Sequence, residues 1–420
     1  MATSTLYKMR TVALREMNGG HDESYAWLPK YYEVVRSTNP GSIANWCRSL
    51  VGVDGAHLKG NFGGVLLSVV AIDANNELFP FAWAIVNAED EESWRFFVWH
   101  LKRVLQSCKR GDGDEWCIIS DRQKGIDAAV TALWPTTGRR YCCKHLAKNW
   151  KGAFPGPLMY ALFWKACSAT SPFTFKKAME QIQRTNPLAL VWLSKIGDQA
   201  RWSRHQFDPN ICSEENKTNF VESFNATLGV DRARPVLTLR VCMVRMSKRR
   251  QACANWNDNE PCPNIVRRIQ KFVLDSRMCK AYESGPGEFE IRDGKSMLPV
   301  SLNKRTCICG LWQISGLPCK HAIRALLYAK EDPYMYTSTW YYGGVYKQTY
   351  GQTIKSIPDQ DNWPEIDQPK ILPPTLRRGV DRPPRNRRRE IGEEEKGKRS
   401  TTIRCTNCHE FGHNRLTCKG

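Results

Sequence analysis

Residues 50–87 read LVGVDGAHLKGNFGGVLLSVVAIDANNELFPFAWAIVN, and their alternation of apolar runs with turn residues decides the fold. A short apolar run ends at Asp54, which predicts a buried strand. Residues 65–72 and 78–86 predict two further strands, and the turn-forming residues DANN at 73–76 lie between them. The stretch therefore predicts one strand followed by a β-hairpin.

Helices and strands continue to alternate beyond the hairpin. Residues 91–107 carry apolar side chains at helical spacing and acidic residues at the start, which predicts a helix. We expect a short buried strand at 116–120, a helix at 123–133 and another strand at 140–142. This order predicts an α/β fold in which a mixed sheet carries helices on its faces.

The flanking regions differ in character from this core. Residues 1–48 predict a helix and a loop, because the tract STNPG at 37–41 breaks any periodicity. Residues 151–260 are rich in tryptophan and phenylalanine and predict a wholly helical segment, whereas residues 261–330 combine short strand-like pieces with cysteines.

The composition is that of a basic, globular protein. The chain has 420 residues, of which 41% are hydrophobic, and this is enough to build a sizeable core. A formal charge of +20 predicts a polyanionic partner, with nucleic acid first and an anionic membrane surface second. No stretch approaches the roughly 18 apolar residues that a membrane span requires, and we expect no secretory signal. The 17 cysteines are therefore expected in a reducing compartment, as metal ligands rather than disulfides.

Two aspartates follow predicted buried strands: Asp54 in VDGAHLKG and Asp121 in IISDRQKG. Carboxylates at adjacent strand ends of an open sheet face one crevice, where they can hold a pair of divalent ions for phosphodiester chemistry. Magnesium suits such a site, because it is a hard cation that prefers oxygen ligands. Each aspartate alone is also explained by a helix N-cap or a turn, and Asp73 is expected to serve the hairpin turn.

The segments VDGAHLKG, IISDRQKGIDAAV and RRYCCKHLAKNW, together with the residues between them, resemble the Mutator-like element (MuDR-type) transposase domain over about residues 50–150. The resemblance implies an RNase H-like fold with a helical insertion before the last acid. It also implies a DDE-type nuclease that uses Mg²⁺ or Mn²⁺, with Asp54 and Asp121 as the first two acids.

The resemblance extends to residues beyond the second aspartate. The third acid matches best at Glu222, in NFVESFN on an expected helix, with Glu214 and Glu215 as alternatives. Cys142 and His145 match the C-x-x-H signature of the family. Because they are three residues apart at a helix start, they share a face. They are expected either to pack as a buried thiol and a hydrogen-bonded imidazole or to have a structural or metal-linked role.

A first cysteine-histidine module lies at residues 307–321, CICGLWQISGLPCKH. Its four soft ligands fit a tetrahedral structural zinc ion, and the i, i+2 spacing of the first two thiols places them on one face of a strand. The pattern resembles a SWIM zinc finger, which implies a DNA or protein ligand; free buried thiols are the alternative. The expected zinc ligands are Cys307, Cys309, Cys319 and His321.

A second module, CTNCHEFGHNRLTC, occupies residues 405–418. The C-x2-C-x4-H-x4-C spacing resembles a CCHC zinc knuckle, which implies a second structural zinc ion and binding of single-stranded nucleic acid. A module this small is expected to need its metal in order to fold. The expected ligands are Cys405, Cys408, His413 and Cys418.

Nucleic-acid contacts are expected in and just before the knuckle. Phe411 is the candidate for stacking on a base, and Arg415 is the candidate for a phosphate contact. Residues 370–420 contain 14 Lys and Arg against 6 Asp and Glu, a net charge of about +8. This tract predicts a nuclear-import signal or a phosphate-binding arm, unless it is merely a solvated linker. Its densest cluster is Arg387, Arg388 and Arg389.

These features divide the chain into six segments. They are an N-terminal helical segment (1–48), an RNase H-like transposase core (49–150), a helical insertion with the C-terminal core helices (151–260), a SWIM-type zinc-finger region (261–345), a proline-rich charged linker (346–400) and a CCHC zinc knuckle (401–420).

Two functions remain in competition. The first is a nuclear DDE transposase that cleaves and rejoins DNA as a possible homo-oligomer. The second is a catalytically inactive or domesticated relic that binds DNA through zinc and regulates transcription. We expect no N-terminal zinc-bearing DNA-binding domain, and the segment between Pro40 and Val53 predicts that a strand is missing before Asp54; both favour the second. A third interpretation, an RNA-binding protein, is supported by the knuckle alone.

Overall fold

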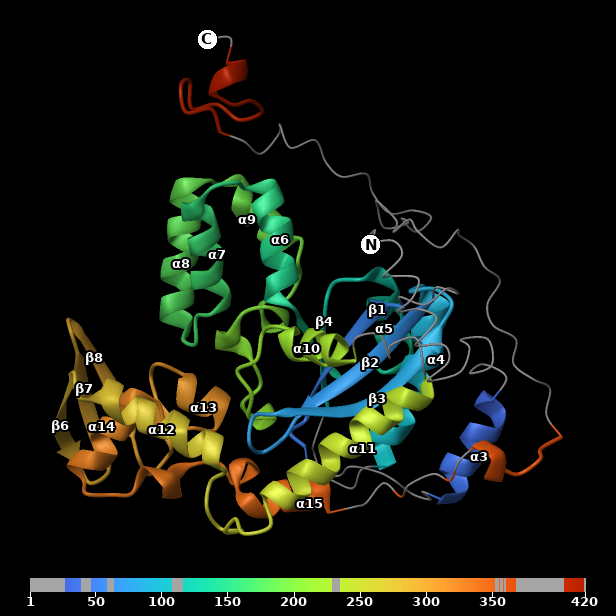
Figure 1. The fold of residues 1–420 in the computed structure, drawn as a ribbon. Coiled ribbons are helices and arrows are strands. Elements are labelled where there is room, and N and C mark those ends of the chain that lie inside the picture. Colours follow the sequence, from blue (N-terminus) through green and yellow to red (C-terminus); the bar gives the residue numbers. More distant parts are fainter. Residues whose placement is uncertain are drawn as a thin grey trace, which may run out of the picture.

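A computed structural model describes most of the chain, and all structural statements below concern the residues that it describes (Figure 1). The expected basic cluster at Arg387, Arg388 and Arg389 lies outside them. The described residues are 27–38, 47–58, 64–107, 116–228, 235–351, 355, 358, 360–367 and 404–418.

A five-stranded mixed sheet forms the centre of the first half of the chain (Figure 1). The first three strands in sequence are antiparallel neighbours, and β4 and β5 extend the sheet in parallel from β1. The expected α/β class with a mixed sheet is confirmed. In spatial order the strands are β3 (Leu78–Val86), β2 (Val65–Ile72), β1 (Leu50–His57), β4 (Cys117–Ser120) and β5 (Gly138–Tyr141).

The first strand is longer than expected. β1 does not end at Asp54 but continues to His57, because its antiparallel pairing with β2 persists to that residue. The parallel pairing with β4 stops earlier, at Gly52. The expectation that a strand is missing before β1 stays a prediction, because residues 39–46 lie outside the described residues.

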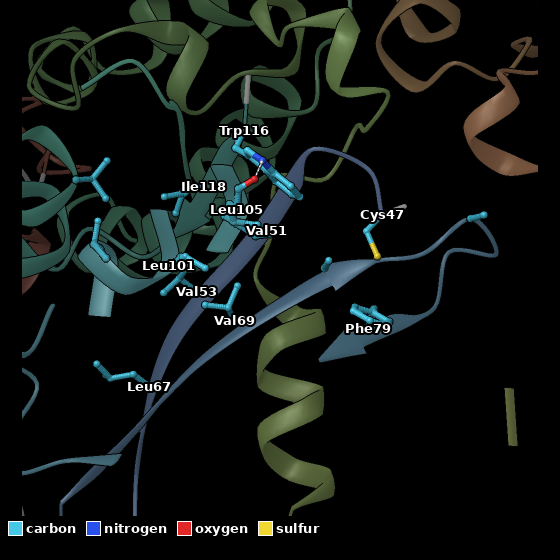
Figure 2. Packing of buried hydrophobic residues seen from close by; sticks show 14 of the residues in the cluster. Cys47, Val51, Val53, Leu67, Val69, Phe79, Leu101, Leu105, Trp116 and Ile118 are labelled. Carbon is cyan, nitrogen blue, oxygen red and sulfur yellow. Dashed lines mark hydrogen bonds between the residues drawn. The ribbon is translucent and has the colours of Figure 1, made fainter. Parts of the chain in front are cut away.

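Two amphipathic helices, α4 (Glu91–Ser107) and α5 (Lys124–Leu133), cover one face of the sheet. Val53 of β1, Leu105 of α4 and Trp116 belong to one buried cluster on this face (Figure 2). The indole Nε1 of Trp116 donates a hydrogen bond to the carbonyl oxygen of Leu105 at 3.3 Å, so even this large side chain leaves no polar atom unpaired.

The opposite face of the sheet carries α10 (Asn219–Thr227). The helix lies directly on β1 at Gly52, the position that has no side chain. A Cβ at Gly52 would lie 2.4 Å from both Phe220 Cζ and Val221 Cγ2, well inside van der Waals contact. The glycine is therefore required for the close approach of α10.

The segment between the sheet and α10 contains a separate helical core, built around the fully buried Trp150. It was expected to be wholly helical as far as residue 260, and this is wrong for residues 195–218. That stretch forms three 3-10 turns, two of which are capped by the side chains of Asp198 and Asp208, and then runs without regular structure to α10. The helices of this insertion are α6 (Cys143–Ala153), α7 (Pro157–Cys167), α8 (Pro172–Thr185) and α9 (Leu188–Ser194), and the turns are η1 (Gln199–Arg201), η2 (Arg204–Gln206) and η3 (Pro209–Ile211).

The second half of the chain contains a small four-stranded antiparallel sheet that packs against α14. Two long helices precede this sheet. The elements are α11 (Pro235–Ala252), α12 (Pro263–Ser276), β6 (Cys279–Gly285), β7 (Glu288–Asp293), β8 (Ser296–Ser301), β9 (Thr306–Cys307), α13 (Leu311–Ser315), α14 (Lys320–Tyr328), η5 (Pro333–Tyr336) and η6 (Thr339–Tyr341).

The expected linker from residue 346 contains folded pieces. Helix α15 (Gly343–Tyr350) runs into it and packs against α11. Further on, next to η7 (Gln360–Asn362), Trp363 lies 5.9 Å from Trp27 and 5.8 Å from Tyr31 between ring centroids, so this segment packs at the start of α3 (Leu28–Thr38). Aromatic side chains fix both pieces, a signal that the high proline and charge content concealed.

Asp73 serves the hairpin turn, as expected, because its Oδ1 accepts the backbone N–H groups of Asn75 at 2.9 Å and Glu77 at 2.8 Å. Its second oxygen has a role that the sequence did not reveal. Oδ2 accepts from Arg249 Nη1 of α11 at 2.9 Å and from Tyr350 Oη of α15 at 2.7 Å. This fully buried carboxylate therefore joins the hairpin to both helices.

None of the helices in the described ranges combines the length and the apolar character that crossing a membrane would require.

The contact at Gly52 gives a first prediction. Gly52→Ala should destabilise the protein by about 1–3 kcal/mol, because the new methyl group forces α10 away from β1. Gly152→Ala in α6 is the matched control, since a Cβ there meets nothing within 4 Å. It should be neutral or slightly stabilising. Urea unfolding measures both, and equal stabilities of the two variants would contradict the packing argument.

Candidate functional site

Asp54 lies on β1, and Asp121 directly follows Ser120, the last residue of the parallel strand β4. The two strands pair as far as Gly52 and Ile119, two residues before each aspartate. Side chains alternate along a strand, so Asp54 is on the same face of β1 as Gly52, which is the face covered by α10. The negative charge of Asp121 acts on Asp54, so the two carboxyl groups lie near each other.

Helix α10 brings Glu222 and Asn225 to the two aspartates. Asn225 Nδ2 donates a hydrogen bond to Asp54 Oδ2 at 3.1 Å, and Ser68 Oγ of β2 donates to Asn225 Oδ1 at 2.9 Å. These two hydrogen bonds in series hold the Asp54 carboxylate in one orientation. The sequence analysis missed Asn225 and Ser68; the signal for Asn225 was its i, i+3 spacing from Glu222, which places both on one helix face.

Burial and negative charge accumulate at Asp54. Desolvation, followed by the negative charges of Asp121 and Glu222, raises the pKa of Asp54 to about 7, although His145 and the Asn225 hydrogen bond act in the opposite direction. The carboxyl group is therefore partly protonated at neutral pH. A bound cation would relieve this accumulation, because it would favour the ionised form.

Glu222 already has basic neighbours. Lys144 Nζ donates to Glu222 Oε2, and His145 Nε2 lies 3.9 Å from Glu222 Oε1. A hydrogen bond with Cys142, together with the charges of Cys142, Asp121 and Asp54, raises the pKa of His145 to about 9. A positive imidazole thus faces the acids at neutral pH.

The C-x-x-H pair has a structural position at this site. Cys142 is the buried N-cap residue of α6, and its Sγ accepts the backbone N–H of Thr218 at 3.2 Å. Burial opposes ionisation of Cys142, but hydrogen bonds involving His145 and Thr218 outweigh it and lower the pKa of the thiol. The pair therefore anchors the start of α6 to the segment that leads into α10.

The alternative third acids lie elsewhere. Glu214 forms ion pairs with Arg268 and, at 3.7 Å, with Arg204. The backbone carbonyl of Glu215 accepts from Arg140. Glu222 is the candidate whose charge acts on Asp54. Within the described ranges, however, the three acids do not form a set whose oxygens all lie within 4.8 Å of one another.

Two sets that do meet this condition are the expected zinc sites. In the first, the Cys307 and Cys319 sulphurs lie 3.7 and 3.8 Å from Nδ1 of His321, and Cys309 completes the group. Three thiols and one imidazole are the donor set of a structural tetrahedral zinc site. The side chains present therefore fit the ion.

Asp293 is a functional neighbour of this site that the motif does not contain. It is the last residue of β7, and its Oδ2 lies 3.1 Å from Nε2 of His321 and 2.5 Å from Nζ of Lys320. The carboxylate holds the imidazole so that Nδ1 faces the three sulphurs. Such partners orient histidine ligands in zinc sites and increase their basicity.

The second zinc set lies in the knuckle, where Cys408 Sγ is 3.1 Å from His413 Nε2 and Cys405 and Cys418 complete the group. Gly412 has φ +106°, a backbone conformation that favours glycine and turns the chain into His413. The donor set again fits zinc.

The knuckle's candidate contact residues are only partly free. Phe411 is half-buried, and the guanidinium of Arg404 lies 5.9 Å from its ring centroid. Arg415 is exposed in η9 (Arg415–Thr417), and the next residue, Leu416, is 93% exposed. The sequence analysis did not single out Leu416, which offers an apolar surface beside Arg415.

The described residues thus define a class of protein in which a mixed α/β sheet that carries acidic side chains is joined to small modules whose cysteines and histidines can bind zinc. Family models support this class: the MULE transposase domain matches residues 50–149, and the SWIM zinc finger matches residues 292–330. The two matches support the assignment of the chain to the Mutator-like transposases, as a zinc-binding nucleic-acid protein of transposase origin. No curated protein matches the chain.

The raised pKa of Asp54 gives a second prediction. The folded protein keeps a proton on Asp54 that the unfolded chain releases, so this group costs stability as pH rises from about 4 to about 7. Asp54→Asn cannot ionise and keeps the acceptor for Asn225. It should raise Tm by roughly 2–4 °C at pH 8 without magnesium, and leave it unchanged at pH 4.

Asp275→Asn, an exposed aspartate of α12, serves as the control for this measurement. If Asp54→Asn raises Tm by the same amount at pH 4 and at pH 8, the carboxyl group of Asp54 does not keep its proton on folding.

The contact of Asp293 gives a third prediction. Asp293→Ala should weaken zinc binding at the first site by about 10–100-fold, because His321 loses its orienting partner. Competition with a chromophoric chelator measures the affinity. The control is Glu290→Ala, an exposed acid on the same strand. If both variants bind zinc like the wild type, Asp293 does not position the histidine.

Proposed function

We propose that this chain is a DDE-type transposase that cleaves DNA strands and joins them to new sites. Asp54, Asp121 and Glu222 would be its catalytic acids. The observation that carries the proposal is that the negative charges of Asp121, which follows β4, and of Glu222 on α10 both act on the buried Asp54 of β1.

The three carboxylates supply the oxygen ligands that Mg²⁺ or Mn²⁺ prefers. When bound, such ions would activate the attacking oxygen and stabilise the leaving oxygen in phosphodiester chemistry. The protein's own contribution is to hold Asp54 through Asn225 and Ser68 and to keep the carboxyl groups in a partly buried place.

The zinc modules would position the nucleic acid. Zinc at both modules would be structural, because protein side chains fill all four positions of each site. In the knuckle, we infer that Arg415 contacts a phosphate and that Phe411 contacts a base of single-stranded nucleic acid. A nuclear location and assembly into a homo-oligomer follow from this function and are proposed with it.

A specific observation favours a second function, a transposase relic that binds DNA without cutting it and regulates transcription. Lys144 and His145 face the Glu222 carboxylate, and a metal ion would have to compete with them. At each zinc module, by contrast, four cysteine and histidine ligand atoms lie within 4.8 Å of one another. Loss of catalysis would leave DNA binding intact.

Strand nicking and strand transfer on generic DNA with Mg²⁺ or Mn²⁺ test the proposal. Wild-type activity should depend on the divalent ion and fall at least about 100-fold in Asp54→Ala and in Asp121→Ala, because each removes a carboxylate ligand. Asp275→Ala should retain full activity. A wild type that binds DNA and zinc but cuts nothing would favour the relic.

A further inference from the structure

Three arginines surround one tyrosine beside Asp121. Tyr141 is the last residue of β5, directly level with Ser120 of β4, and is therefore at the same sheet edge as Asp121. The guanidinium carbons of Arg122, Arg139 and Arg201 lie 5.6, 5.0 and 5.8 Å from the centre of its ring. All three distances are within the range of a cation–π interaction.

The three arginines are not equivalent. Arg139 is almost buried and pairs with Asp127 of α5 at 2.9 Å, and it also donates to the Asp121 backbone carbonyl at 3.1 Å. Its charge is compensated, and its role is to hold the backbone at the second catalytic aspartate. Asp127 is also engaged by the Tyr141 hydroxyl, which donates to it at 3.1 Å.

Arg122 and Arg201 are different, because both are exposed and no carboxylate of the described residues forms an ion pair with either. Arg201 donates from Nη1 to the Tyr141 hydroxyl at 3.0 Å, which fixes its direction. The cluster's one acid, Asp127, forms its ion pair with Arg139. The cluster has an excess of two positive charges at the edge of the sheet where the catalytic acids end.

The surroundings of the cluster leave room for a ligand. An open hollow between α5 and η1 is lined in part by Asp127, Thr131, Arg139 and Arg201, whereas Arg122 lies outside its lining. Fixed guanidinium groups are suited to phosphate, because they present several N–H donors in one plane. Positive charge beside a row of carboxylates is unfavourable for a cationic ligand and favourable for an anion that runs past the acids.

We propose that Arg122 and Arg201 bind backbone phosphates of the DNA that the acids cut, on the side of Asp121 remote from α10. This inference rests on the proposed function for the identity of the ligand. It places the strand across the carboxyl edge of the sheet, from the acids to the arginines. Tyr141 acts as the common platform that holds the two guanidinium groups at a fixed spacing.

The test is the salt dependence of DNA binding by the full chain, measured by fluorescence anisotropy with a labelled duplex and without magnesium or manganese. A protein that loses two phosphate contacts should show a slope of log K against log salt that is smaller by about 2. We expect this change in Arg122→Ala combined with Arg201→Ala. The paired lysine variant keeps both charges and should restore most of the slope.

The control pair is Arg184→Ala with Arg277→Ala, two exposed arginines at the ends of α8 and α12 that carry the same total charge. It should leave the slope close to the wild-type value. An unchanged slope in the Arg122 and Arg201 pair, or an equal change in the control pair, overturns the proposal. An effect confined to an RNA duplex of the same sequence also overturns it.

The failure of this inference is distinguishable from a failure of the catalytic proposal. Asp54→Ala should leave the salt slope unchanged while abolishing strand nicking. If the arginine pair changes the slope but the wild type never nicks DNA, the phosphate site stands and the catalytic proposal fails. If nicking depends on Asp54 but the double variant of Arg122 and Arg201 has the wild-type salt slope, the catalytic proposal stands and the phosphate site fails.

Discussion

The contact between Gly52 and α10 is the constraint on which the carboxylate site depends. A helix packed on a sheet normally stands off by the length of the side chains between them, and here that spacing is absent at one strand position. Phe220 and Val221 fill the space above Gly52, so the next residue, Glu222, and the residue one turn later, Asn225, are brought to Asp54. One missing side chain thereby sets the position of the third acid across a separation of more than 160 residues.

Negative and positive side chains lie close together at the carboxylate site. Burial, followed by the negative charges of Asp121 and Glu222, raises the pKa of Asp54. Two basic side chains, Lys144 and a protonated His145, offset the negative charge on the side of Glu222. The same side chains that stabilise the acids without metal also compete with metal for Glu222. If the proposed catalytic site binds a divalent ion, Lys144 and His145 must first release the Glu222 carboxylate.

The sequence predicted features that depend on local spacing and failed for those that depend on distant packing. The hairpin and both zinc ligand sets lie within short motifs, because turn formation and metal coordination bring near neighbours together. Asp293 lies outside its motif, and the second role of Asp73 requires Arg249 and Tyr350 from far along the chain. The length of β1 was missed because pairing with β2, not composition, carries the strand past Asp54.

The two zinc modules differ in how they connect to the core. In the knuckle, the backbone hydrogen bonds of the described residues join members of 404–418, and Cys405, Cys408, His413 and Cys418 would hold a zinc ion there. The SWIM finger is built onto the transposase domain: Thr170 Oγ1 of the insertion donates to the Cys309 carbonyl at 2.6 Å, and Tyr341 Oη bridges the Ser315 carbonyl at 2.7 Å and Arg48 Nη1 at 2.9 Å. Zinc bound at the finger would fix the loop that receives these hydrogen bonds. The finger thus packs against the rest of the folded chain through side chains from distant segments.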